Sequence, residues 1–173
     1  MKNRRKKILQ TIREKDGTYQ YTGESFRLIT KEEQKVSPLK KLTICCILAF
    51  LVIVFSGTLD TKAAFGAFYV IVPYVGEVSA LFMLVWNFVS LVCNKDNMRS
   101  YVLDHIRSRI PGAATVLSIC ALLGLAFSLF YLFRFGSEGQ MTATILYLIC
   151  KGAAALLALE CRKAFRGLEW EKV

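Results

Sequence analysis

Four long runs of apolar residues, separated by polar connections, dominate the chain. They cover residues 42–59, 63–93, 113–133 and 141–159. A helix needs about 17–25 apolar residues to cross the hydrocarbon core of a bilayer, and the length of each run falls within or above this range. The pattern predicts an all-α integral membrane protein in which residues 42–160 form a four-transmembrane-helix bundle.

The second run, residues 63–93, is longer than one span requires, and Pro73 interrupts it. One interpretation is a single tilted helix that kinks near Pro73. The alternative makes residues 63–72 a separate interfacial or re-entrant segment before the span. We favour the kinked helix, and in either case Tyr69 and Tyr74 suit the exterior interface.

The connection between the second and third runs carries an apolar residue at every fourth position. This spacing predicts an amphipathic helix over about residues 97–110, lying on the inner leaflet and ended by Pro111 and Gly112. The repeating residues are Met98, Val102, Ile106 and Ile110.

Residues 1–41 form a basic N-terminal arm, and residues 161–173 form a short tail. The arm begins with a basic stretch that predicts either a short amphipathic helix ending near Gly17 or a solvated leader. Beyond it, residues 18–21 and 25–29 flank a turn and predict a small hairpin. We expect the basic side chains of the arm to contact lipid headgroups; they are Arg4, Arg5, Lys6, Lys7, Lys40 and Lys41.

Nearly all the Lys and Arg residues lie in segments on one side of the predicted membrane. Twelve lie before the first span, four in residues 94–112 and four after Glu160, whereas the other two connections hold only Lys62 and Arg134. Basic residues collect in the cytoplasmic loops of membrane proteins. We therefore predict an inner or plasma membrane protein with both termini in the cytoplasm.

Composition supports the membrane class and excludes several others. Hydrophobic residues make up 54% of the 173 residues, and the mean hydropathy is +0.41, which is typical of membrane proteins. The net charge of +10 suggests nucleic-acid binding, but the charges crowd against the apolar runs, and attraction to anionic lipid explains them better. We therefore expect the bilayer, and no nucleic acid, as a partner.

The residues that carry catalysis or bind metals do not form a recognisable set. The six cysteines include no C-x-x-C pair, and there is one histidine, His105, so the sequence predicts no metal site and no cofactor. No P-loop, HExxH motif or catalytic triad pattern is present. We expect reduced cysteines that serve packing, and no enzymatic activity.

Small residues recur at four-residue spacing within three of the runs. Faces of this kind let membrane helices approach closely. They predict a compact bundle with the third and fourth spans in contact, although the same faces suit contact with another chain. The residues are Gly76 and Ala80, then Cys120, Gly124 and Ser128, then Cys150, Ala154 and Ala158.

Glu77 and Lys151 are the two ionisable residues that lie well within the predicted membrane depth. A charge at that depth is costly unless it is paired or hydrated, so each is a candidate functional residue. Counted from Cys93 and Glu160 at 1.5 Å per residue, they lie about 24 Å and 14 Å from the cytoplasmic ends of their helices. A gap of about 10 Å leaves open whether they meet.

Three functions are consistent with the sequence. The first is a non-catalytic accessory or assembly subunit, or a homo-oligomeric module, with Lys151 pairing to an acidic residue of another subunit. The second is a small transporter or channel subunit that works through Glu77 and Lys151, with Asn87 lining the same cavity. The third is a sensor of lipids or partners that acts through the basic arm. Glu77 and Lys151 are purely structural in a further interpretation.

Overall fold

The computed structural model describes residues 12–15, 18–21, 25–29, 37–59, 66–95, 98–136 and 141–172. Within these ranges it contains four helices that are long and apolar enough to cross a membrane. This confirms the prediction of a helical, multi-pass membrane protein. The helices are α2 (Pro38–Thr58), α4 (Phe68–Cys93), α5 (Ser100–Phe135) and α6 (Met141–Arg166).

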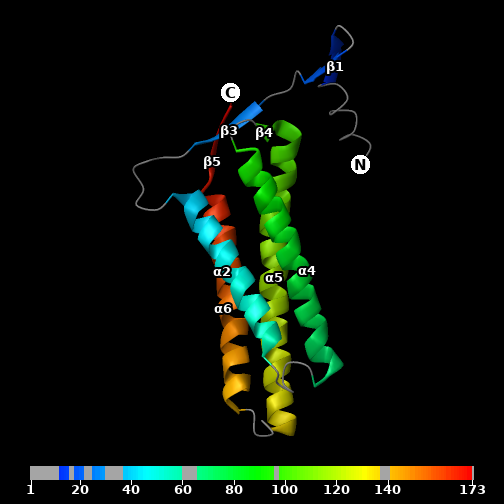
Figure 1. Ribbon diagram of the computed structural model, residues 1–173, viewed down its shortest axis with the longest axis vertical. Coiled ribbons are helices and arrows are strands. Elements are labelled where there is room, and N and C mark those ends of the chain that lie inside the picture. The colour runs from blue at the N-terminus through cyan, green and yellow to red at the C-terminus, as the bar shows by residue number, and fades with distance from the viewer. Residues whose placement is uncertain are drawn as a thin grey trace.

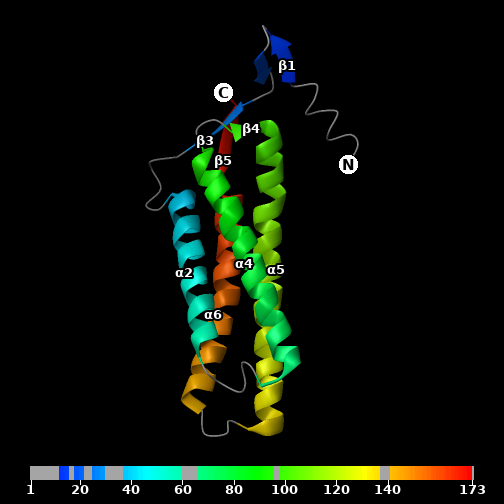
Figure 2. The ribbon, with the colours of Figure 1, turned by 45° about the vertical axis from the view of Figure 1, so that its right-hand side comes forward.

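The four helices run up and down alternately along the long axis of the molecule (Figure 1). Helix α5 packs against both α4 and α6, and α2 packs mainly against α6, with a smaller contact to α4. Two views show α4 running obliquely to α5 (Figures 1 and 2). Spans three and four therefore lie in contact, as the small residues predicted.

Helix α2 begins before the apolar run that predicted it. Ser37 caps its N-terminus by accepting a hydrogen bond from the Lys40 amide at 3.4 Å, and Pro38 occupies the first turn. A proline there loses no helical hydrogen bond and has a backbone angle suited to a helix start. The capping residues, rather than hydropathy, set this boundary.

Helix α4 passes through Pro73 without ending. The helix starts at Phe68 and continues to Cys93, so residues 68–72 belong to it rather than to a separate segment. Pro73 lies within its second turn, where the missing amide removes one backbone hydrogen bond. Residues 63–65 of the predicted span lie outside the described residues.

Helix α5 continues through Pro111, so the helix predicted to stop there is instead the first three turns of α5. Proline inside a helix costs about 3 kcal/mol. Burying one large apolar side chain recovers about 1.5–3 kcal/mol, and Leu103, Ile106 and Ile110 are all buried in the core of the bundle. The apolar strip therefore faces the protein, and packing outweighs the proline.

A three-stranded antiparallel sheet closes one end of the bundle. Strand β3 (Ser25–Ile29) lies between β4 (Met98–Arg99) and β5 (Glu169–Lys172). In the register, Phe26 is opposite both Met98 and Lys172. The sheet joins the arm, the α4–α5 connection and the C-terminal tail.

This pairing corrects the predicted hairpin of residues 18–21 with 25–29. Strand β2 (Thr18–Tyr21) instead pairs with β1 (Ile12–Lys15), and β3 pairs with strands distant in sequence. The strand at residues 12–15 also contradicts the helical interpretation of that part of the arm. The remainder of that predicted segment, with Arg4, Arg5, Lys6 and Lys7, lies outside the described residues.

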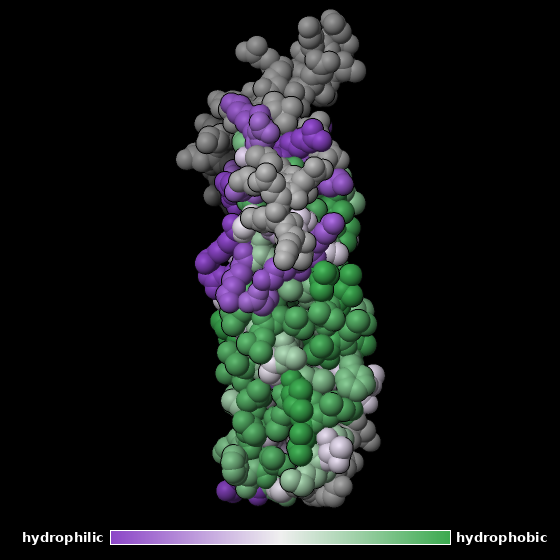
Figure 3. Space-filling view, turned by 90° about the vertical axis from the view of Figure 1, so that its left-hand side faces the viewer, coloured by the Kyte–Doolittle hydropathy of each residue, from purple (hydrophilic) through white to green (hydrophobic). Residues whose placement is uncertain are grey.

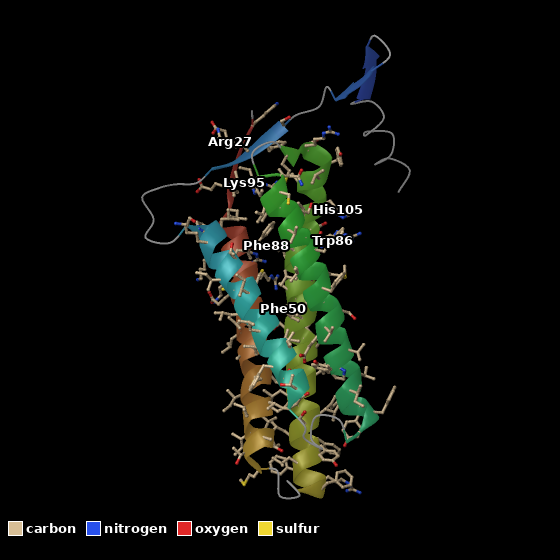
Figure 4. All side chains as sticks on the ribbon, viewed as in Figure 1. Arg27, Phe50, Trp86, Phe88, Lys95 and His105 are labelled. Atoms are coloured by element: carbon tan, nitrogen blue, oxygen red, sulfur yellow. The ribbon has the colours of Figure 1, made fainter. Side chains whose placement is uncertain are left out.

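The surface divides into an apolar belt and a polar end. Figure 3 shows hydrophobic residues along most of the helices and hydrophilic residues gathered near the sheet. Phe50 on α2 and Trp86 on α4 lie on the belt (Figure 4), with 49% and 68% of their surfaces exposed. Arg27 lies on β3, and Lys95 lies close to the sheet (Figure 4). Such a belt suits a surface covered by lipid.

Candidate intramembrane charge site

Glu77 and Lys151 form a buried ion pair between α4 and α6. The Lys151 ammonium donates hydrogen bonds to both carboxylate oxygens of Glu77, over 2.7 Å to Oε2 and 2.9 Å to Oε1. Their side chains are 0% and 1% exposed, respectively. Bidentate, charge-assisted bonds of this length are among the strongest that proteins make. The two charges that the sequence placed within the membrane therefore satisfy each other.

Two tyrosine rings complete the surroundings of the ammonium. Lys151 Nζ lies 4.6 Å from the ring centroid of Tyr74 and 4.9 Å from that of Tyr147. Both distances fall within the range of cation–π attraction, which is strongest where water is excluded. The ammonium is thus held by one carboxylate and two aromatic faces.

The pair lies near the middle of the membrane-spanning region. Glu77 is nine residues from the start of α4, and Lys151 is ten residues from the start of α6. At 1.5 Å per residue both are about 14–15 Å from the end opposite the sheet. This distance is about half the thickness of a hydrocarbon core, which is about 30 Å.

The sequence predicts that Glu77 and Lys151 differ in depth by about 10 Å. The structure shows them in contact, because α4 and α6 do not end at the same level. The sequence estimate treated Cys93 and Glu160 as equally deep. In Figure 1 the end of α4 lies beyond the end of α6, and α4 is inclined. Helix α6 itself continues past Glu160 to Arg166. These offsets bring Glu77 level with Lys151.

Glycines on α4 and α5 permit this close approach. A Cβ atom on Gly124 would lie 3.1 Å from Glu77 Oε1 and 3.7 Å from Lys151 Cε, and one on Gly76 would lie 2.8 Å from Cys120 Sγ. The other small residues predicted for helix packing are buried in the bundle: Ala80, Ser128, Cys150, Ala154 and Ala158. The faces that could have met another chain are used within this one.

Asn87 does not join the site. It is also buried, but its side-chain amide donates to the Met83 carbonyl at 2.6 Å on the same helix. It lies ten residues from Glu77 along α4, which corresponds to about 15 Å. The structure therefore does not bring Asn87 beside the Glu77–Lys151 pair.

Polar side chains continue from the pair toward the end opposite the sheet. Ser128, Thr144 and Tyr147 are at most 2% exposed. The Tyr147 hydroxyl makes no hydrogen bond within the described part of the chain, and the Ser128 hydroxyl donates to the Gly124 carbonyl at 2.8 Å. Toward the sheet, Ser118 and Asn87 are the polar residues in a described core dominated by Ala and Leu. The site is thus polar on one side.

The tyrosines are the residues that sequence reasoning missed. The sequence suggests an interfacial position for Tyr74, but its side chain is half-buried and its ring faces Lys151. A signal was present, since Tyr74 precedes Glu77 by three residues and Tyr147 precedes Lys151 by four. Residues at those spacings share a face of a helix.

Two further clusters lie toward the sheet. Cys46 and Cys161 are buried with their sulfurs 3.9 Å apart, which is van der Waals contact between thiols. Glu160 pairs with Lys41 at 2.7 Å and with Lys163 at 2.9 Å on the surface. Lys41, predicted to contact headgroups, thus has a protein partner. Among the described residues, no group of three or more His, Cys, Asp or Glu is placed to hold a metal.

No protein-family model matches the chain, and no curated protein or solved structure shows significant similarity to it.

Proposed function

We propose that the chain is a non-catalytic membrane module, acting as an accessory or assembly subunit or as a homo-oligomer. The observation that carries this proposal is the Glu77–Lys151 pair. Its charges are enclosed and satisfied within one chain, so they fix the arrangement of α4 and α6. A buried pair of this kind favours helix packings that keep the two charges together, because separating them leaves a buried charge without its partner.

Because Lys151 is already paired, a partner subunit is expected to bind elsewhere on the chain. The sequence suggested that Lys151 meets an acidic residue of another subunit, but Lys151 is 1% exposed and bonded to Glu77. The polar end of the bundle is the better candidate, because its charged side chains are exposed. They include Arg27, Lys40, Lys95, Arg107, Arg109 and Arg166.

Purification in mild detergent, with the molar mass of the complex measured, tests this function. We expect the native chain to self-associate or to carry a second component. Lys95→Glu together with Arg107→Glu should release it, whereas Arg134→Glu, at the opposite end of the bundle, should not. A native chain that is monomeric and alone both in mild detergent and in native-lipid discs would refute the proposal.

We further propose that the sheet end faces the cytoplasm of an inner or plasma membrane. Strand β3 of the arm pairs with β5 of the tail, so these two segments lie at one end of the bundle. Of the described Lys and Arg residues, Arg134 lies at the opposite end and Lys151 lies between the ends. The positive-inside bias then supports a cytoplasmic sheet.

Cys93 offers a native reporter of sidedness, because it is exposed at the sheet end of α4. An impermeant maleimide added to intact cells should leave Cys93 unlabelled and should label it after lysis. The variant Arg134→Cys should be labelled in intact cells. Labelling of Cys93 without lysis would reverse the proposed orientation.

Transport is the second candidate function, favoured by one observation. A buried charged pair between two spans, close to Pro73 and to a Tyr147 hydroxyl that has no partner among the described residues, is the kind of intramembrane site that proton and ion pathways use. In this alternative Glu77→Gln abolishes ion-coupled flux in proteoliposomes while the variant still folds. Unchanged flux in a folded Glu77→Gln protein would remove it.

Lipid sensing by the basic arm is a third proposal, which rests on composition. Each Lys or Arg near an anionic surface contributes about 1 kcal/mol of attraction. Removal of residues 1–11 from the full chain should weaken its preference for anionic over neutral lipid discs. The same preference in both chains would dismiss this role.

A further inference from the structure

The surroundings of Lys151 Nζ have the composition of a binding site for an ammonium ion. The carboxylate of Glu77 contributes two acceptors within 2.9 Å, and Tyr74 and Tyr147 present their rings within 4.9 Å. Proteins that bind free alkylammonium ligands combine a negative group with aromatic faces in the same way. Here the ammonium belongs to the chain itself.

The Tyr147 hydroxyl is a further polar group of the site, and its hydrogen-bonding capacity is unused among the described residues. Its residue is 1% exposed, and its oxygen has no hydrogen-bond partner among the described residues. Buried hydroxyls normally have a partner, because leaving one unpaired costs about 1–3 kcal/mol. Tyr147 lies one turn before Lys151 on α6, on the polar side of the pair and away from the Ala- and Leu-rich core.

We propose that Glu77, Tyr74 and Tyr147 form a binding site for a small primary ammonium ion, and that Lys151 Nζ fills it as a tethered occupant. This inference goes beyond the proposed function and does not depend on it, since a chain with no partner would contain the same site. The ligand class is a protonated primary amine, recognised by a carboxylate and two aromatic rings.

The tether explains why the test must alter Lys151. A group attached to its own site has an effective concentration that a free ligand rarely matches. A free amine should therefore bind weakly to the native chain and tightly once the tethered ammonium is removed. Lys151→Ala removes three carbons and the nitrogen, which together match n-propylammonium.

The first experiment measures the thermal unfolding of purified Lys151→Ala in detergent as n-propylammonium chloride is added. We expect a saturable rise in unfolding temperature. 1-Propanol, which has a similar shape and no charge, and tetramethylammonium, which has no N–H donor, should not reproduce it. Adding Glu77→Gln should weaken the apparent affinity by about tenfold or more, because a charge-assisted acceptor is lost.

A second variant keeps the test decisive if Lys151→Ala leaves too large a cavity to fold. Lys151→Met retains an apolar stem and leaves free only the place of Nζ, which ammonium itself should fill. Ammonium chloride should then raise the unfolding temperature of Lys151→Met more than sodium chloride does. Lys41→Ala is the matched control: it removes the lysine of the exposed pair with Glu160, so amines should not stabilise it.

Stabilisation of either variant by its matched cation, lost on Glu77→Gln, supports the site. Three results would overturn it: no stabilisation of either folded variant, equal stabilisation by 1-propanol, or equal stabilisation with Gln at position 77. Failure of both variants to fold even with their matched cations would also overturn it, because the site would then need its covalent occupant.

Discussion

Breaking the Glu77–Lys151 pair should destabilise the bundle far more than breaking an exposed pair of equal length. Lys151→Met removes the donor of both carboxylate hydrogen bonds and leaves Glu77 buried without it. Removing one partner of a buried pair costs about 3–5 kcal/mol, because the remaining charge loses its compensation. The lost cation–π contacts with Tyr74 and Tyr147 act in the same direction.

The chain supplies its own control in Lys41 and Glu160. Their charged atoms are 2.7 Å apart, the same as the shorter distance in the buried pair, but their side chains are 51% and 35% exposed. Water and ions screen exposed pairs, and Glu160 keeps Lys163 as a second partner. Lys41→Met should therefore have little effect on the free energy of unfolding.

Reversible unfolding in mixed detergent and dodecyl sulfate micelles, followed by circular dichroism, gives these free energies. A double variant, Glu77→Leu with Lys151→Met, should lose less stability than Lys151→Met alone. The coupling between the two positions should reach about 2–3 kcal/mol. Equal losses for Lys41→Met and Lys151→Met, or additive losses in the double variant, would refute the reasoning.

The remaining predictions concern packing and the sheet. Gly124→Ala should lower stability by about 1–3 kcal/mol in thermal unfolding, because its Cβ would press on the ion pair, whereas Gly112→Ala, with nothing within 4 Å, should be neutral or stabilising. Gly76→Ala should also destabilise, and Cys120→Ala should restore the loss, since the new Cβ would meet Cys120 Sγ; no restoration would place the strain elsewhere. Leu28 is buried, so Leu28→Asp should free β3 from the sheet and increase proteolysis between β3 and α2 while the helix content stays the same. A rate of proteolysis equal to that of the native chain would mean that the sheet does not depend on this leucine.

Hydropathy predicted the helices because a bilayer-spanning helix requires a long apolar run. Such a run can be recognised from consecutive residues of the sequence alone. The helix ends were less predictable. Pro111 signalled a helix end, yet Ile106 and Ile110 before it, and Ala114 after it, are all buried in the same core. Their packing outweighs the local preference of one proline, and that packing is not visible in the neighbouring sequence.

The sheet could not be predicted from local patterns. Strand β4 has two residues and β5 has four, lengths too short to give a clear alternation of apolar and polar positions. Their common partner, β3, lies far away in the chain, and the nearer segment 18–21 offered a simpler hairpin. The register of Leu28 with Trp170 depends on how the helices place the strands.

The sequence predicted the two charged residues of the candidate site, but it did not predict the tyrosines that surround them. Glu77 and Lys151 stood out because charges within apolar runs are rare. Whether they meet depends on the relative heights of α4 and α6, which a count of residues from assumed helix ends cannot supply. The contribution of Tyr74 depends on which way its side chain turns, and an interfacial position was equally compatible with the sequence.

The ion pair also has a consequence for how the chain is made. Glu77 leaves the ribosome 74 residues ahead of Lys151, and at synthesis rates of 5–20 residues per second the interval lasts about 4–15 s. During that time the second span has entered or approached the bilayer while its counter-charge does not yet exist. During the interval the carboxyl group lacks the donor that it has in the finished chain. Completion of the last helix is therefore the event that supplies both of its hydrogen bonds.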